Sequence, residues 1–327
     1  MYNIKVLVTI LKWGYVTMSQ PTYKIRNYQT SDFDGYVNLH IETARLDRSG
    51  CYISREMLRE SLQRPVYNPE KNLFIAEASG KIVGFLNITP ELITRRVLLD
   101  CLVHPEHRRT GLAKRILEPA TRRARELRAT MIHVSVPEKN STAREVLSRL
   151  GFSVVRQFLE MSLSLSNLKP LDPSSNEFVL RHLHRGEEGI LANLQNLCFA
   201  GTWGFNPNTP EEIAYSLSLS SASTEDVVLA YDGDRPTGYC WTKINGETSA
   251  DAGGKRGRIL MLGVDHDYRD KGIGKLTLET GLSYLKDKGV RVVELTVDSE
   301  NQPACSLYRA ASFKVQARSL WYEKQVD

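Results

Sequence analysis

A repeated motif is the feature that most limits what this chain can fold into. Arg108–Ala113 and Arg269–Gly274 both combine basic residues with glycine, and the second segment follows the first by 161 residues (108 to 269). An asparagine lies at the same distance beyond each segment, at Asn140 and at Asn301. Self-similarity at a constant offset indicates a duplicated structural unit. We therefore expect two copies of one domain in tandem.

The order of predicted secondary structure supports the duplication. In each copy, apolar runs separated by short turns predict antiparallel strands, and a helical apolar stripe and another strand follow the basic segment. The first copy has predicted strands at 74–78, 82–89, 97–103 and 131–136 and a helix at 111–129. The second copy has predicted strands at 227–231, 237–244, 259–264 and 290–297 and a helix at 272–288.

A chain of 327 residues has room for two domains of moderate size. We expect a first domain at 18–165 and a second at 177–327, joined by a linker at 166–176 that is rich in serine and proline. Met18 opens a polar stretch before the first plausible strand. We therefore expect residues 1–17 to be a non-native or disordered extension, with Met18 as the natural start.

Charge and cysteine usage narrow the class of protein. The net charge of +5 attracts anions but does not choose among nucleic acid, membrane and a phosphorylated cofactor. The five cysteines are widely spaced and form no Cys-x-x-Cys pair, which argues against a disulfide framework and favours a cytoplasmic location. We expect no metal site, since His104-Pro105-Glu106-His107 fits no standard zinc motif.

Each basic segment has the composition of an anion site. An apolar strand leads into it and a helix begins there, and the first N–H groups of a helix have no internal partner. Arg269, Lys271 and Lys275 add positive charge in the second copy. One such turn is a weak signal, but two with the same spacing are hard to dismiss. A P-loop and a Rossmann fingerprint are excluded because the required glycine spacings do not occur.

These residues resemble the GNAT superfamily of N-acetyltransferases. The superfamily motif Arg/Gln-x-x-Gly-x-Gly/Ala, preceded by a strand with an apolar-x-Val ending and followed by Asn-x-x-Ala, occurs in both copies. The resemblance covers the chain from about Tyr23 onward and is to members with two domains. It implies two tandem GNAT-like α/β domains, each a mixed, mostly antiparallel sheet flanked by helices. It also implies acetyl transfer from acetyl-CoA to a primary amine of a small molecule.

The resemblance further implies which residues bind acetyl-CoA. The turn would hold the diphosphate, the preceding strand would pair with the pantetheine arm and polarise the thioester carbonyl, and the asparagine would contact the arm. The positions in the second copy are Leu262, Gly263, Val264, Arg269, Asp270, Lys271, Gly272, Ile273, Gly274, Lys275 and Asn301. The positions in the first copy are Cys101, Leu102, Val103, Arg108, Arg109, Thr110, Gly111, Leu112, Ala113 and Lys114.

Tyr308 is the sharpest catalytic candidate. It lies two helical turns after Asn301, and the resemblance implies that it protonates the departing thiolate as general acid. The matching residue of the first copy is Leu147, which has no proton to donate. We therefore expect the second copy to be catalytic, and the first to bind acetyl-CoA or to serve structurally.

The general base is not assigned by the sequence. Where tandem members of the superfamily carry a glutamate base, this chain has Arg258, which cannot accept a proton. A water relay to a remote carboxylate, a neutral amine and a different substrate all remain open. Arg258 and Lys243 are expected to contact the acceptor and would suit an acidic group on it.

Two other classes of function are compatible with parts of this sequence. A non-catalytic acyl-CoA sensor or scaffold would use the turns for binding only, and Tyr308 favours the enzyme over it. A nucleic-acid-binding protein would use the basic helix, but acidic residues interrupt it and a solvated face is expected. The aromatic loop Trp203–Pro207 either shapes an acceptor pocket or closes the core. We expect a small-molecule amine substrate, neither nucleic acid nor membrane as a partner, and a monomer or homodimer.

Overall fold

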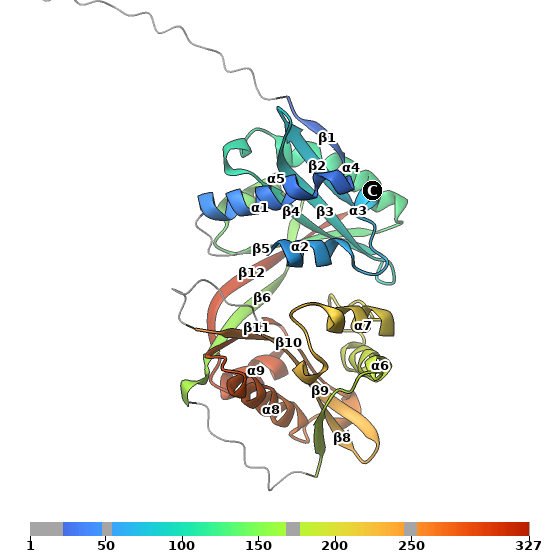
Figure 1. Ribbon diagram of the computed structural model, residues 1–327, viewed down its shortest axis with the longest axis vertical. Coiled ribbons are helices and arrows are strands. Elements are labelled where there is room, and N and C mark those ends of the chain that lie inside the picture. Colours follow the sequence, from blue (N-terminus) through green and yellow to red (C-terminus); the bar gives the residue numbers. More distant parts are fainter. Residues whose placement is uncertain (1–21, 48–53, 168–176, 245–253, 327) are drawn as a thin grey trace, which may run out of the picture.

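The computed structural model describes residues 22–47, 54–167, 177–244 and 254–326. In these ranges the strands form one twelve-stranded sheet, in the order β1-β2-β3-β4-β5-β12-β6-β11-β10-β9-β8-β7, with helices against its faces (Figure 1). The two expected α/β copies are confirmed, and their sheets are continuous with each other. The expected extension at 1–17, Met18 and most of the expected linker (168–176) lie outside the described residues.

Every predicted strand and helix is present, with ends displaced by at most three residues, as at the start of β10. The first copy contains β1 (Lys24–Asn27), α1 (Phe33–Asp47), α2 (Arg55–Leu62), α3 (Pro69–Asn72), β2 (Leu73–Ala78), β3 (Lys81–Glu91), β4 (Arg96–Val103), α4 (Leu112–Glu126), β5 (Met131–Pro137), α5 (Ser141–Arg149) and β6 (Ser153–Ser164). The second contains β7 (Val179–His182), α6 (Glu188–Phe199), α7 (Pro210–Ser218), β8 (Val227–Asp232), β9 (Arg235–Ile244), β10 (Arg256–Val264), α8 (Ile273–Asp287), β11 (Val292–Asp298), α9 (Gln302–Ala310) and β12 (Lys314–Gln325).

The two copies exchange their last strands. β12 of the second copy pairs antiparallel with β5 of the first, and β6 of the first pairs antiparallel with β11 of the second. β6 and β12 also pair with each other, so the junction lies in the middle of the sheet (Figure 1). The exchange leaves neither half with an open strand edge at the junction, which removes a site for unwanted pairing. The repeat in the sequence does not predict this exchange.

The helices after the two turns lie against the sheet through the apolar stripes that the sequence predicts. In α4 the buried residues are Leu112, Ile116, Leu117, Ala120 and Ala124, which recur at helical spacing. In α8 the buried stripe begins at Ile273 and continues through Leu285. Burial of these stripes sets the position of each helix start, and therefore of each turn, against the strands. No helix in the described part of the chain is long and apolar enough to cross a membrane.

Candidate active site

The two basic turns have the same backbone conformation. Arg109 and Asp270 have φ values of 63° and 62°, and Gly111 and Gly272 both have φ of 81° as the residue before the helix. Glycine adopts this left-handed conformation without steric cost. A β-carbon at either glycine would meet nothing within 4 Å, so the approach to the helix start is open. Each turn therefore presents free N–H groups at a helix N-terminus, where an anion is favoured.

The arginines at the start of the two turns have different hydrogen-bond partners. Arg108 of the first copy donates to both carboxylate oxygens of Asp47, at 2.8 and 2.6 Å. Its counterpart Arg269 instead donates to the backbone carbonyl of Cys198 at 3.3 Å, and a carbonyl leaves its charge uncompensated. The Lys271 ammonium lies 4.4 Å from the ring centre of Tyr268. The two turns therefore differ at their first arginine: Arg108 is neutralised by a carboxylate, and Arg269 is not.

The strand before each turn separates from its parallel neighbour. β4 pairs with β5 only as far as Leu99, and β10 pairs with β11 only as far as Arg258. Beyond those points, Cys101–Val103 and Leu262–Val264 have no paired strand on that side among the described residues. Their backbone N–H and C=O groups are therefore available to an extended ligand, which can add to an open strand edge.

One irregularity distinguishes the second copy. The pairing of β10 with β9 shifts between Ile259 and Met261, which leaves Leu260 as an extra residue in a β-bulge. The pairing of β4 with β3 continues without a shift from Arg96 to Val103. Bulges are over-represented beside active sites because they bend a strand and redirect its side chains.

Tyr308 lies in α9 against the strands of the second copy. Only 6% of its surface is exposed, and its ring packs edge-on against Phe313 with ring centres 5.8 Å apart. It shares an apolar cluster with Cys240 of β9 and Leu262 of β10. Burial, with a smaller contribution from the neighbouring thiols, raises the pKa of Tyr308 above its ordinary value. Tyr308 is therefore protonated at neutral pH.

The residues that match Tyr308 and Asn301 in the first copy show which features are shared. Leu147 packs against the apolar core of the first copy and has no ionisable group. Asn140 and Asn301 both cap a helix, since their Oδ1 atoms accept the N–H of Ala143 and Ala304 at 3.0 and 3.1 Å. The cap explains the Asn-x-x-Ala spacing locally. The expected contact of Asn301 with acetyl-CoA stays a prediction.

A cavity of about 310 Å³ lies beside the bulge, between α6, α7, β9 and β10. Its polar and aromatic lining includes Gln195, Asn208, Glu212, Asp226, Trp241 and Lys243. Leu260 and Met261 also line it, so the cavity begins two residues before Leu262. Lys243 faces this cavity, and Arg258 is its direct partner across the β9–β10 pair. Like charges directly opposite each other destabilise a sheet unless an anion or carboxylate compensates them.

The sequence does not predict several of the lining residues, because no motif marks them. Gln195 is fully buried; its Oε1 accepts from Asn208 Nδ2 at 2.7 Å, and its Nε2 has no partner among the described residues. Asp226 accepts from the Tyr284 hydroxyl at 2.9 Å, and burial raises its pKa. Their assembly depends on tertiary contacts of α6, α7 and β8. The Thr209–Glu212 capping box could have predicted the start of α7, though not the cavity.

Two other candidate sites are the histidines His104 and His107 and the thiol of Cys305. His104 accepts the N–H of Glu106 at 3.4 Å, and His107 shares a hydrogen bond of 3.1 Å with the Tyr23 hydroxyl. In the described ranges, no group of three or more His, Cys, Asp or Glu side chains could hold a metal ion. Cys305 is buried, which raises the pKa of its thiol, and this disfavours a nucleophilic thiolate.

The comparison with known families finds the same duplication that the sequence repeat indicates. The sequence pattern of the Acetyltransferase (GNAT) family matches residues 38–152 and again residues 189–313. The chain belongs to the GNAT family. GNAT acetyltransferases use acetyl-CoA, and this chain is a tandem GNAT enzyme that transfers an acetyl group to an amine.

Relatives and solved structures agree with a tandem GNAT architecture. The chain is 27% identical over 275 residues to a mycothiol acetyltransferase of Segniliparus rotundus, covering 82% of this chain and 98% of that protein. It is 24% identical over 313 residues to a mycothiol acetyltransferase of Mycobacterium sp. (strain MCS), covering 92% and 98%.

The solved structures support the fold alone. A GCN5-related N-acetyltransferase from Sphaerobacter thermophilus superposes with a TM-score of 0.70 at 21% identity, covering 93% of this chain and 96% of that one. A tandem GNAT protein from the clavulanic acid biosynthesis pathway superposes with a TM-score of 0.67 at 15% identity, covering 94% and 99%.

Proposed function

We propose that the second copy of this GNAT enzyme transfers the acetyl group from acetyl-CoA to a small primary amine held in the cavity beside β10. The observation that carries the proposal is the difference at one position. Tyr308 belongs to the apolar cluster against which Leu262 of β10 packs, whereas the first copy has Leu147 at the matching position. The second copy, which carries Tyr308, is also the copy that has the bulge at Leu260 and the cavity next to it.

The geometry supports separate binding positions for the parts of acetyl-CoA, one at the turn and one along β10. The diphosphate of CoA would lie on the N–H groups at Gly272–Gly274, and the pantetheine arm along Leu262–Val264. An N–H of that strand would donate to the thioester carbonyl and stabilise the oxyanion that forms on it. Gly274 lies where these elements meet, since a β-carbon there would be 3.5 Å from Val264 and 3.6 Å from Leu307 of α9.

The chemistry then needs one proton donor and one proton acceptor. The amine nitrogen attacks the thioester carbon, the C–N bond forms, and the C–S bond breaks to release the CoA thiolate. Tyr308 donates its proton to that sulfur. The amine loses a proton in the same reaction, and Arg258 cannot accept it. Glu212 and Asp226 are the carboxylates that line the cavity, so a water relay from the amine has an acceptor within the site.

The pH profile of kcat tests the state of Tyr308. A raised pKa means that its proton is present at and below the ordinary tyrosine value of about 10 and is lost only above it. We therefore expect kcat to rise with pH as the amine deprotonates, with no descending limb below about pH 10. A descending limb in that range that disappears in Tyr308→Phe would contradict this assignment.

A matched pair of variants tests which turn binds acetyl-CoA. Lys275 and Lys114 occupy the same position at the start of α8 and of α4, and both are exposed. We expect Lys275→Glu to weaken acetyl-CoA binding about tenfold, or ~1.4 kcal/mol, because a negative charge would repel the diphosphate. Calorimetry with Lys114→Glu should give the wild-type affinity. Equal losses in both variants would show that both copies bind the cofactor.

The acceptor class is tested with a defined panel. The relatives of this chain include mycothiol acetyltransferases, so an amine of low molecular weight is the first expectation. Lys243 and Arg258 favour an acceptor with an acidic group. Release of CoA is measured with glucosamine, cysteamine, L-glutamate and L-glutamine, and we expect L-glutamate to have a lower KM than L-glutamine. No CoA release above hydrolysis with any amine, together with tight acetyl-CoA binding, would favour an acyl-CoA sensor.

A further inference from the structure

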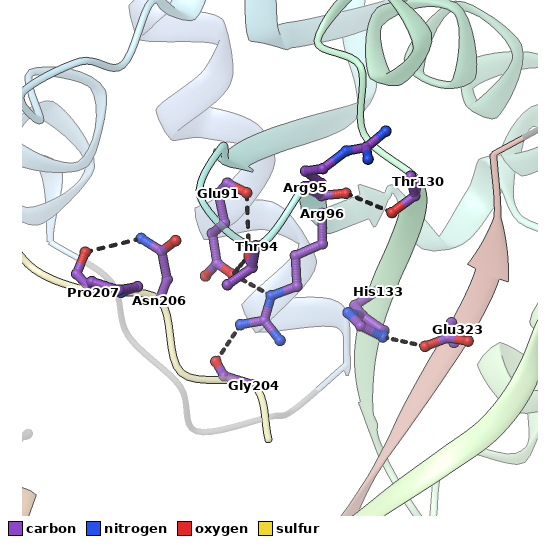
Figure 2. Close-up of polar contacts among 10 residues, drawn as sticks. All are labelled: Glu91, Thr94, Arg95, Arg96, Thr130, His133, Gly204, Asn206, Pro207 and Glu323. Carbon is purple, nitrogen blue, oxygen red and sulfur yellow. Dashed lines mark hydrogen bonds and ion pairs between the residues drawn. The ribbon is translucent and has the colours of Figure 1, made fainter. Parts of the chain in front are cut away.

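The connection between α6 and α7 of the second copy is held by a buried arginine of the first copy. Figure 2 shows the side chain of Arg96, at the start of β4, directed at the backbone carbonyl of Gly204. The same guanidinium pairs with the carboxylate of Glu91. The side chain of Arg96 is 6% exposed and that of Glu91 13%, so this contact between the copies is shielded from water. Charge-assisted hydrogen bonds in such surroundings are strong.

Trp203, the neighbour of Gly204, anchors the same connection at the strand exchange. Its ring is surrounded by side chains from four strands, and these include both exchanged strands, β6 and β12. The ring-centre distances are 5.4 Å to His133, 6.0 Å to Phe158 and 5.7 Å to Trp321. The guanidinium carbons of Arg96 and Arg156 lie 5.9 and 5.2 Å from the ring centre, within the range of cation–π attraction.

The other end of this connection forms the wall of the cavity. Asn208, five residues after Trp203, accepts from Asn196 through its carbonyl at 2.9 Å and donates its N–H to the Asn196 side chain at 2.8 Å. It also donates to Gln195 at 2.7 Å, and both Asn208 and Gln195 line the cavity. A short and continuous path therefore joins the contact between the copies to the cavity.

A second contact between the copies reinforces α7, the helix that supplies Glu212 and Ser216 to the cavity. The hydroxyl of Tyr215 donates to the carbonyl of Glu60 in α2, and the N–H of Ser220 donates to Glu60 Oε1 at 2.8 Å. Both ends of the cavity wall are thus held by residues of the first copy.

We propose that Arg96 and Trp203 are positioning residues for the acceptor, and that the first copy acts on the reaction by holding the acceptor cavity of the second. This proposal rests on the proposed function, because it takes the cavity beside β10 as the acceptor site. The first copy then has a role in the reaction even though Leu147 cannot donate a proton. This role also does not require the turn of the first copy to bind acetyl-CoA. It also separates acceptor binding from cofactor binding, because Arg96 contacts the connection that carries Asn208 of the cavity wall.

The experiment compares neighbouring arginines in the full chain. Arg96→Gln removes the contact with Gly204, and Arg95→Gln changes the same charge at an exposed position. Because Arg96→Gln leaves Glu91 unpaired, the double variant Glu91→Gln/Arg96→Gln and the single variant Trp203→Leu are measured beside it. The readouts are amide hydrogen exchange of residues 200–220, the calorimetric dissociation constant of acetyl-CoA, and KM and kcat for the best amine of the four-compound panel.

We expect amide exchange in 200–209 to accelerate at least tenfold in the Arg96 and Trp203 variants and to stay unchanged in Arg95→Gln. The KM for the amine should rise about tenfold, kcat should change less than threefold, and acetyl-CoA affinity should be retained, which is the pattern of lost ground-state positioning. Unchanged exchange, unchanged KM, or a fall in kcat and acetyl-CoA affinity as large as the rise in KM would overturn the proposal. Failure of the proposed function would look different, since the wild type would then release no CoA while the exchange data kept their contrast.

Discussion

Tyr308→Phe is expected to lower kcat by about two to three orders of magnitude, within the range that general acid catalysis contributes. The substitution removes one hydroxyl from a side chain that is 6% exposed and leaves its ring contact with Phe313 in place. Without the acid, the CoA thiolate must leave unprotonated or take its proton from water. The affinity for acetyl-CoA should stay within about twofold of the wild type, because the diphosphate and the pantetheine arm are held elsewhere.

The control for this prediction is Tyr322→Phe. Tyr322 is 4% exposed and belongs to the core of the first copy, so the same atom is lost from an equally buried tyrosine that has no place in the reaction. We expect its kcat to match that of the wild type in steady-state assays. An unchanged kcat in Tyr308→Phe would remove Tyr308 from the mechanism.

Gly263→Ala is expected to reduce the free energy of unfolding by roughly 1–3 kcal/mol, the usual cost of overpacking a close-packed site. A β-carbon at Gly263 would lie 2.7 Å from Cε1 of Tyr239, 2.9 Å from Cβ of Cys198 and 3.0 Å from Cε2 of Phe199. These atoms belong to α6 and β9, so relief requires α6 to move away from β10. Because β10 is the strand proposed to bind the pantetheine arm, acetyl-CoA affinity should fall in the same variant.

Gly189→Ala is the matched control, because the same methyl group is added to a glycine of α6 with space beside it. Its β-carbon would be 3.9 Å from Pro210, an ordinary contact, and alanine is the better helix former. We expect this variant to be as stable as the wild type or more stable in denaturant titrations. Equal stability of Gly263→Ala and the wild type would show that α6 does not pack on β10 as described.

The first copy has Leu102 where the second has Gly263, and this difference shows how similar motifs produce different clefts. Leu102 fills the space above β4 and packs against the cluster that contains Leu58 and Phe85. At Gly263 the same space is filled by Cys198 of α6 and by Tyr239 of β9. The motif alone therefore identifies the two turns as equivalent but does not describe the space in front of each strand.

Features that depend on a few neighbouring residues were determined by the sequence. The left-handed glycines before α4 and α8, the asparagine caps of α5 and α9, and the buried stripes of both long helices follow from local conformational preference and periodicity. A constant spacing along a helix also placed Tyr308 and Leu147 at equivalent positions. Each of these features depends only on residues that lie within about two helical turns or within one strand.

Only the tertiary structure decided which strands pair at the junction and what surrounds the cavity. The apolar pattern of β6 and β12 is the same whether each strand pairs within its own copy or with the other, so local sequence does not select between the two. Arg96 and Gln195 are likewise ordinary residues in the sequence, and for Trp203 the sequence left two roles open. The environment of all three arises from contacts between segments that are about one hundred residues apart or belong to different helices and strands. Strand pairing and buried polar contacts depend on residues far apart in the sequence, because they are determined by the free energy of the whole packed sheet.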